Sequence, residues 1–464
     1  MHLTSFQHAA SAALFAVGVS CQSSLTASYS NTLQTITGFG VSQAFGRAQE
    51  FYNMSPTPRQ KGLDYLFSTT AGAGLTIVRN RVGSGTVASD SILPTSPGCP
   101  TCQPSYSWDG VDRGQVWFSK AAQSYGVQTF YADAWSAPGF MKTNGLETGG
   151  GYLCGVTGRT CSSGDWRQAY ANMLAQYVKY YQQEGITITH LGFLNEPDYT
   201  TSYSSMQSNG KEAASFIPTL RNTLNNNGLS SVQLACCDAV GWSSQRTITT
   251  DLLSSGVQGQ LGVITSHTYG SDVDGTINTS GLPVWVTEAA DLNSAWCTTW
   301  YSNGGLCEGL TWAKRIATGI VTGNLSAYIY WQGVEVNQFQ ASSYLVASDG
   351  TNVTPSGRLW AFAMWSRYVR PGARRLSTTG TIPNVIWATL KNTDGSVVAV
   401  FTNTGGSAQS ASLKIDGYIP TKASGWVVNN ATGNNIASQP VSLSGGTALV
   451  SIPAYSVVTA VLNQ

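Results

Sequence analysis

Between residue 37 and about residue 371, short runs of β-forming residues alternate with longer segments of helical periodicity, and this alternation restricts the fold more than any other feature. Segment 165–185 shows the helical pattern: it begins with an Asp, repeats apolar residues about every 3.6 positions and ends at a Gly. Segments 307–323 and 357–372 are similar. Such repeated strand–helix units predict an α/β fold, a (β/α)8 TIM barrel. The strand candidates are residues 37–43, 75–83, 127–135, 188–196, 232–239, 262–270, 283–289 and 327–333.

The pattern changes after residue 371. Helical periodicity disappears, and β-branched residues alternate with polar ones, as in 396–405 and 455–464. This alternation predicts an antiparallel β-sandwich side domain over residues 372–464. Residues 24–36 have the same pattern, so we expect segment 22–36 to form a strand that joins the side domain to the barrel.

The first 21 residues contain an apolar stretch of signal-peptide length, too short to span a bilayer as a helix. We expect cleavage near Cys21 and Gln22, and a secreted, extracellular protein. Five Asn-x-Ser/Thr sequons agree with secretion by a eukaryotic cell. They are at Asn53, Asn278, Asn324, Asn352 and Asn430.

Eight of the nine cysteines follow this segment, and an even number in a secreted chain favours disulfides over metal ligation. Three pairs are close enough in sequence to close local loops. Cys236 and Cys237 are adjacent, and the sequence leaves open whether they bond to each other or elsewhere. The three local pairs are Cys99 with Cys102, Cys154 with Cys161, and Cys297 with Cys307.

The formal net charge is +1 and only 10% of the residues are charged, so the chain has no electrostatic footprint for nucleic acid or an anionic membrane. Abundant aromatic and small polar residues suit a neutral, hydroxylated ligand such as a sugar, although an ordinary extracellular surface has the same composition. There is no G-x-S-x-G motif, and only His190 and His267 follow the signal segment, which argues against a serine hydrolase and a catalytic zinc site. We expect a monomer without metal or cofactor.

Two glutamates stand where predicted strands end, Glu196 in LGFLNEPDYT and Glu288 in VWVTEAA. Active sites of (β/α)8 barrels lie at the C-terminal ends of the strands, so both side chains should point into one cleft. Cleavage of a glycosidic bond needs such a pair, one carboxyl protonated to assist the leaving oxygen and one ionised to attack the anomeric carbon. The alternative is that both glutamates cap strands or form salt bridges.

Four segments resemble glycoside hydrolase family 30, a retaining family of (β/α)8 barrels with a β-sandwich side domain. The W-S-x-P-x-F-M-K-T-N motif is the most specific, whereas Asn-Glu-Pro is shared with many related barrels. The resemblance covers essentially the whole mature chain, and the cysteine-bearing loops look most like the fungal xylanase branch. The four segments are residues 38–45, 132–145, 188–200 and 284–296.

By this resemblance Glu196 is the general acid/base and Glu288 the nucleophile of a double displacement. Asn195 matches the family residue that hydrogen-bonds the sugar 2-hydroxyl, and Arg79 matches the strand-two arginine that keeps the nucleophile ionised. Arg81 lies two residues further on the same strand face and is expected to share that role. The alternative for Arg79 is a core ion pair.

His267 and Tyr269 end strand six, where related barrels place an aromatic residue against the nucleophile. We expect His267 to support Glu288 and Tyr269 to bind substrate. Trp135 and Trp331 end strands three and eight, and we expect both to stack on sugar faces. The alternative for these four residues is packing inside the barrel.

The resemblance implies β-1,4-xylan as substrate, and glucuronoxylan if a cation binds the glucuronate. The loop after strand eight, residues 331–344, has no Lys or Arg and carries Glu335, so Arg47 after strand one is the best candidate cation. Arg47 could instead pair with Glu50. We expect the long loop 84–111 to wall the glycone end of the cleft and to favour release of short xylooligosaccharides.

The expected partner is therefore plant cell-wall polysaccharide. Two other functions stay open. One is the same fold acting on β-1,6-galactan or a β-glucoside, and the other is a secreted carbohydrate-binding protein without turnover.

Overall fold

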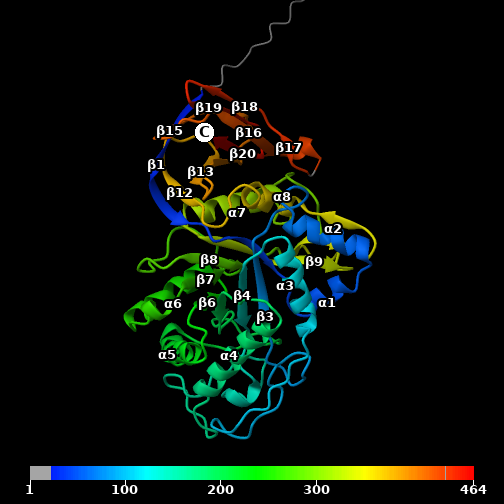
Figure 1. Ribbon diagram of the computed structural model, residues 1–464, viewed down its shortest axis with the longest axis vertical. Helices are drawn as coiled ribbons and strands as arrows, with labels where there is room; N and C mark the ends of the chain where they lie inside the picture. Colours follow the sequence, from blue (N-terminus) through cyan, green and yellow to red (C-terminus); the bar gives the residue numbers. More distant parts are fainter. Residues whose placement is uncertain (1–21, 434) are drawn as a thin grey trace, which may run out of the picture.

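The computed structural model describes residues 22–433 and 435–464, which form a barrel and a smaller β-sheet domain (Figure 1). Helices α7 (Gly309–Val321) and α8 (Gly357–Ser366) lie between the two bodies, packed against strands of the smaller domain. The predicted signal peptide lies outside the described residues.

Eight parallel strands form a closed barrel, because β9 pairs with both β2 and β8. Strands β2, β3, β7 and β8 are buried along their whole length, as expected for strands covered by helices on one face and by side chains on the other. The predicted (β/α)8 barrel is confirmed. Its strands are β2 (Gly38–Ser42), β3 (Ile77–Val82), β4 (Thr129–Ala134), β5 (His190–Gly192), β6 (Gln233–Ala239), β7 (Val263–His267), β8 (Val284–Glu288) and β9 (Ala327–Val336).

Apolar side chains fill the barrel interior below the active site. On β3, β4 and β7, the residue two positions after the apolar one points to the same face. These residues are Arg79, Asp133 and Thr265, and all three are buried. The apolar layer is therefore the floor of a polar site. It consists of Ile77, Tyr131, Ala235, Val263, Trp285, Ala327 and Ile329.

Helices surround the barrel (Figure 1). Of the three helical segments predicted from the sequence, 165–185 and 307–323 are each two residues shorter at both ends, whereas the helix predicted over 357–372 already ends at Ser366. No helix in the described part of the chain has the length and apolar character needed to cross a membrane. The other helices are α1 (Arg47–Tyr52), α2 (Pro56–Phe67), α3 (Gln115–Ser124), α4 (Arg167–Gln183), α5 (Gly210–Asn226) and α6 (Trp242–Ser254). Short 3-10 turns are η1 (Asp112–Gly114), η2 (Gly139–Met141), η3 (Gln258–Gln260) and η4 (Asn430–Thr432).

The smaller domain is built on one ten-stranded sheet, ordered β17-β16-β20-β14-β13-β12-β1-β15-β19-β18. The N-terminal strand β1 (Ser23–Thr35) pairs antiparallel with β12 and parallel with β15, so the sheet is mixed rather than purely antiparallel. Two further strands, β10 (Tyr344–Ser348) and β11 (Val353–Pro355), extend the barrel sheet. The remaining strands are β12 (Arg374–Thr379), β13 (Val385–Lys391), β14 (Val397–Asn403), β15 (Gln409–Asp416), β16 (Lys422–Val428), β17 (Ala437–Ser438), β18 (Val441–Ser444), β19 (Thr447–Ile452) and β20 (Ser456–Asn463).

Two strand ends differ from the sequence prediction. Strand β5 stops at Gly192, so Asn195 and Glu196 lie in the loop that follows rather than at a strand tip. Strand β9 continues to Val336 because β10 pairs alongside it, so Glu335 lies in a strand and not in a loop.

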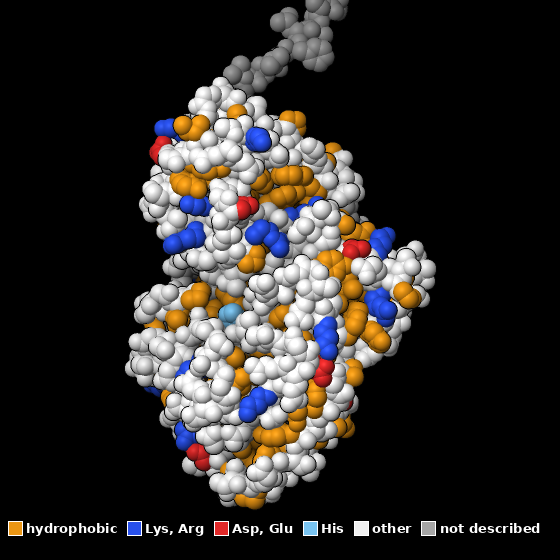
Figure 2. Space-filling model, in the orientation of Figure 1, with side chains coloured by type: hydrophobic (Ala, Val, Ile, Leu, Met, Phe, Trp, Pro, Cys, Tyr) orange, Lys and Arg blue, Asp and Glu red, His pale blue; other side chains and the backbone are white. Residues whose placement is uncertain are grey.

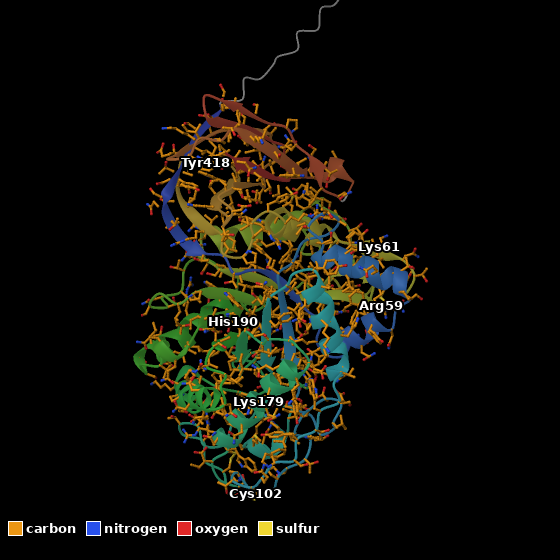
Figure 3. All side chains as sticks on the ribbon, viewed as in Figure 1. Arg59, Lys61, Cys102, Lys179, His190 and Tyr418 are labelled. Atoms are coloured by element: carbon orange, nitrogen blue, oxygen red, sulfur yellow. A yellow bond between two sulfur atoms is a disulfide. The ribbon has the colours of Figure 1, made fainter. Side chains whose placement is uncertain are left out.

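Disulfides join all three local pairs, and Cys236 bonds to its neighbour Cys237, which settles the open alternative. The loop clipped by Cys99 and Cys102 lies at the end of the molecule opposite Tyr418 of the small domain (Figure 3). Charged side chains are sparse on the face shown in Figure 2 and lie among neutral and apolar ones. All five sequon asparagines are exposed.

Candidate active site

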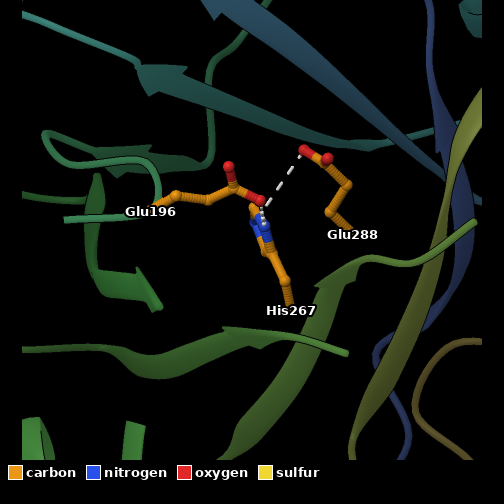
Figure 4. Close-up of side chains that lie close together, drawn as sticks. All are labelled: Glu196, His267 and Glu288. Carbon is orange, nitrogen blue, oxygen red and sulfur yellow. Dashed lines mark hydrogen bonds and ion pairs between the residues drawn. The ribbon is translucent and has the colours of Figure 1, made fainter. Parts of the chain in front are cut away.

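The two glutamates meet in one cleft at the C-terminal end of the barrel (Figure 4). A carboxylate oxygen of Glu196 and one of Glu288 lie within 4.8 Å of each other, and each residue is 6% exposed. Retaining glycosidases hold their carboxyl groups about 5 to 5.5 Å apart, whereas inverting enzymes need about 6.5 to 9.5 Å to admit a water. The observed separation fits double displacement.

The backbone of Glu196 has a φ of 49°, in the left-handed region that residues with a side chain rarely adopt. Its N–H donates to the carbonyl of Asp238, at the end of β6, at 2.8 Å. Such conformations concentrate at functional sites, where the surrounding structure compensates for their cost. This hydrogen bond from the loop to β6 therefore fixes the segment that carries Glu196 into the cleft.

His267 lies between the carboxyl groups (Figure 4). Its Nδ1 is 3.0 Å from Glu196 Oε1 and its Nε2 is 3.2 Å from Asp238 Oδ1, but the nearest contact to Glu288 is longer, 3.8 Å. Burial alone lowers the pKa of His267, but Glu288, Asp238 and Glu196 together raise it to about 10. His267 is thus an imidazolium at neutral pH, and it contacts Glu196 more closely than the nucleophile it was expected to support.

Arg79 connects the floor of the site to its carboxylates. The buried guanidinium forms an ion pair with Glu288, donates to Asp133 Oδ2 at 2.8 Å and donates to Asn195 Oδ1 at 2.6 Å. Because Asn195 uses its oxygen for this bond, its amide nitrogen is left to donate to a ligand. The ring of Trp135 lies 4.4 Å from the guanidinium carbon.

Two groups hold the oxygens of Glu288. Arg79 contacts Oε2, and the hydroxyl of Tyr269 donates to Oε1 at 2.8 Å. Burial raises the pKa of Glu288 above its ordinary value, and His267, Arg79 and the Tyr269 hydrogen bond oppose that rise. These contacts favour the ionised carboxylate that a nucleophile requires.

Replacing Tyr269 with Phe should move the acid limb of the kcat/KM–pH profile to higher pH. The variant loses a hydrogen bond to the ionised form of Glu288, so the pKa of that carboxyl rises and more of it is protonated at a given acidic pH. Because a charge-assisted hydrogen bond of this kind is lost, we expect kcat/KM at acidic pH to fall by about tenfold. The kcat/KM profile of the free enzyme measures this. An acid limb that stays in place or moves to lower pH would contradict the assignment.

Two buried carboxyls escaped the sequence analysis, Asp133 at the end of β4 and Asp238 at the end of β6. Asp238 accepts from Thr265 Oγ1 at 2.8 Å and contacts Tyr131 and Thr287. Burial raises the pKa of Asp238, but His267 and Arg79 outweigh burial and hold it below its ordinary value. The pKa of Asp133 lies well above its ordinary value because of burial and the nearby Asp238.

Arg81 does not share the role of Arg79. It is 5% exposed, and its guanidinium pairs with Asp90 at 2.8 Å and with Glu147 at 3.2 Å. Both partners are in loops at the barrel mouth, so Arg81 ties those loops together instead of contacting Glu288. Its guanidinium carbon also lies 4.5 Å from the ring centre of Phe45.

The cleft is a cavity of about 810 Å³ with aromatic walls. Phe45, which the sequence analysis missed, has a φ of 55° and lies 5.5 Å from Trp135 and 6.0 Å from Trp331 between ring centres. Trp135 is only 2% exposed, so its ring mainly supports Arg79, whereas Trp331 is half-buried. Among the described residues, none from loop 84–111 lines this cavity, so the prediction that this loop walls the cleft is wrong. Asp90 of that loop pairs with Arg81 instead.

Arg47 lines the cavity from the first turn of α1 rather than from a loop. Its guanidinium donates to both carboxylate oxygens of Glu50 at 2.9 Å and lies 3.7 Å from Glu335. Burial raises the pKa of Glu335 to about 7, although Arg47 lowers it. Arg47 therefore reaches the cleft and already has two carboxyl neighbours.

One nitrogen of His267 and one oxygen each of Glu196 and Glu288 lie close enough together to surround a cation. However, both nitrogens of a protonated imidazole carry a hydrogen, so neither has a lone pair for a metal. In His267 each of them faces a carboxyl oxygen, Nδ1 that of Glu196 and Nε2 that of Asp238. The donor set is therefore poorly suited to a metal.

Comparisons with known proteins match this architecture domain by domain. The model of glycosyl hydrolase family 59 matches residues 36–361, and the model of the glycosyl hydrolase family 30 β-sandwich domain matches residues 372–460. The solved catalytic domain of GH30 xylanase C from Talaromyces cellulolyticus is 50% identical, covers 95% of this chain and 100% of its own, and superposes with a TM-score of 0.91. The chain belongs to glycoside hydrolase family 30.

More distant relatives of this family 30 glycoside hydrolase have names that refer to different polysaccharides. Endo-1,6-β-D-glucanase neg1 of Aspergillus fumigatus is 24% identical over 92% of this chain and 85% of its own length. Glucuronoxylanase XynC of Bacillus subtilis is 22% identical over 64% of this chain and 66% of its own. The family is therefore established, whereas the names of these relatives do not agree on a substrate.

Proposed function

We propose that this family 30 enzyme cleaves β-1,4-xylan with retention of anomeric configuration, using Glu196 as acid/base and Glu288 as nucleophile. The separation of at most 4.8 Å between their nearest facing oxygens supports this assignment most directly. The 50% identity to a protein named xylanase C supports xylan as the polymer.

In the first step Glu288 attacks the anomeric carbon while Glu196 protonates the leaving oxygen, which gives a covalent glycosyl–enzyme. Glu196, now ionised, takes a proton from water as that water displaces Glu288. Arg79 and Tyr269 hold the two oxygens of Glu288. The amide of Asn195, oriented by Arg79, is placed to donate to a sugar hydroxyl.

A second candidate is an endo-1,6-β-glucanase on the same fold, favoured by the relative from Aspergillus fumigatus that spans 92% of this chain. Incubation with glucuronoxylan, arabinoxylan, β-1,6-glucan and β-1,6-galactan, followed by mass analysis of the products, separates the candidates. We expect xylooligosaccharides. Cleavage of β-1,6-glucan with both xylans left intact would overturn the xylanase proposal, and sugar affinity without any cleavage would favour a binding protein.

Within xylan, we propose that Arg47 binds a glucuronate substituent. Replacing Arg47 with Ala should lower kcat/KM on glucuronoxylan by about tenfold, because a charge-assisted pair is lost, and should leave the carboxyl-reduced polymer unaffected. Arg59→Ala is a matched control, since Arg59 is a partly exposed arginine on α2 (Figure 3) and is not among the residues that line the cavity. Equal loss on the charged and the reduced polymer would reject the role.

We also propose that the enzyme is secreted. The pattern of residues 1–21, the four disulfides and the exposed sequons support secretion, since disulfides persist in oxidising compartments. Glycosylation and the monomeric state stay predictions. Release of short xylooligosaccharides no longer has the support of loop 84–111, so the product masses decide it.

A further inference from the structure

The cavity crosses the barrel mouth between two arcs of strands. Phe45, Trp135 and Trp331 follow or belong to β2, β4 and β9, which are near neighbours in the closed sheet. Tyr199 and Val240 follow β5 and β6 on the other arc. A sugar chain in the cleft therefore has one part over the first arc and the other part over the second.

The acid/base fixes which part of the chain leaves. Glu196 follows β5, so it belongs to the second arc. Because this carboxyl must reach the oxygen of the bond that breaks, the departing sugar lies beside Glu196 and over the residues of that arc. Tyr199 is three positions further along the same loop and is 53% exposed.

The loop that carries Tyr199 is held in place. The backbone N–H of Tyr199 donates to the carbonyl of Glu196 at 2.9 Å, so both residues belong to one hydrogen-bonded turn. The side chain of Asp198 accepts from the N–H of Val240 at 2.9 Å, which ties the turn to the neighbouring loop. Among the described residues no other aromatic ring stacks on Tyr199, in contrast to Tyr203, whose ring lies 6.0 Å from Phe45.

We propose that Tyr199 is the aromatic platform of the leaving-group subsite and so determines which sugars or alcohols bind beside Glu196. This proposal rests on the proposed function. An exposed, pre-positioned ring offers an apolar face to the C–H face of a sugar, while its hydroxyl remains at the polar edge. Neighbouring Val240 continues that apolar wall.

The same subsite would hold an acceptor for glycosyl transfer. After the first sugar departs, the oxygen of an acceptor hydroxyl forms a bond to the anomeric carbon as the ester bond to Glu288 breaks. The hydroxyl proton passes to Glu196, which restores both carboxyls to their starting states. A sugar stacked on Tyr199 is therefore an acceptor in competition with water.

The test compares two donors that share a glycone. Xylotetraose has a leaving sugar, whereas β-xylobiosyl fluoride has a leaving group too small to reach Tyr199. Tyr199→Ala should lower kcat/KM for xylotetraose by about tenfold, as expected for loss of a buried aromatic contact, and should leave the fluoride unchanged. It should also reduce the ratio of transfer products to hydrolysis when xylobiose is added as acceptor.

Tyr199→Phe keeps the ring and should retain most of the activity on xylotetraose. Tyr52→Ala is the control for an exposed tyrosine outside the cleft, 43% exposed at the end of α1. Equal losses on both donors, or no loss on xylotetraose, would overturn the proposal while the wild-type enzyme still cleaves xylan. A wild-type enzyme that cleaves neither donor would overturn the proposed function, and this inference with it.

Discussion

Replacing Glu288 with Ala should reduce kcat on xylan by about four orders of magnitude or more, because the covalent step loses its nucleophile. Azide should restore cleavage of an activated aryl β-glycoside, since the small anion fits the space left by the carboxylate. Attack from that side gives the α-glycosyl azide, and proton NMR of the product shows the configuration directly.

The Glu196→Ala variant should behave differently. An aryl glycoside with a good leaving group needs no proton, so it should still form the glycosyl–enzyme, and azide should then attack from the face opposite Glu288 and give the β-glycosyl azide. Glu184→Ala, which removes a surface carboxylate paired with Lys120 at 2.8 Å, should leave activity unchanged. Azide products of the same configuration from both active-site variants would contradict the roles assigned here.

The position of both glutamates could be predicted because barrel topology is simple. Parallel strands of a closed barrel end at one rim, so carboxyls near two strand ends converge whatever path the helices take. The prediction held for Glu196 even though β5 stops at Gly192, four positions before it. The intervening loop bends back through a hydrogen bond to Asp238 that no sequence pattern reveals.

Arg81 shows a limit of predictions from the two-residue period of a strand. It shares a strand face with Arg79, but two residues of strand are about 6.6 Å of rise, enough to carry it from the interior to the rim. Its partners Asp90 and Glu147 belong to long loops whose paths depend on tertiary packing. Phe45 was missed for the same reason, because the path of the loop after β2 places its ring in the cleft.

The sequence contains only a weak indication that Asp133 and Asp238 belong to the site. Each is an aspartate in an apolar strand, in FYADA and CCDA, and a buried carboxyl needs a partner. Arg79 was the obvious cation, but the sequence offered Glu288 as a sufficient partner. The structure instead shows Arg79 shared among three carboxyl groups, those of Asp133, Asp238 and Glu288.

Arg79 should therefore matter to stability as well as to catalysis. Arg79→Met should lower the free energy of unfolding by about 3 to 5 kcal/mol, because removing one member of a buried ionic cluster leaves the others unpaired, and should lower the Tm by about 3 to 7 °C. Arg246→Met is the matched control. Arg246 pairs with Asp274 at the surface, where both side chains are at least one-third exposed, so its loss should cost about 1 kcal/mol or less.

The two aspartates beside Arg79 should respond to pH with opposite signs. The pKa of Asp133 is raised in the folded protein, so above its ordinary value of 3.8 the folded state binds a proton that the unfolded state has lost, and folding becomes less favourable as pH rises. Asp133→Asn removes this penalty, so its stability relative to the wild type should improve from pH 4.5 to pH 7. Urea unfolding at both pH values measures the change.

Asp238→Asn should show the reverse. The pKa of Asp238 is lowered in the folded protein, so its ionised form stabilises the fold above the ordinary value and loses that contribution as pH falls. The substitution should therefore cost more at pH 7 than at pH 4.5. Asp133 and Asp238 both contact Arg79. If the free energy of unfolding changed equally with pH in the two variants, the two aspartates would not be held in different protonation states.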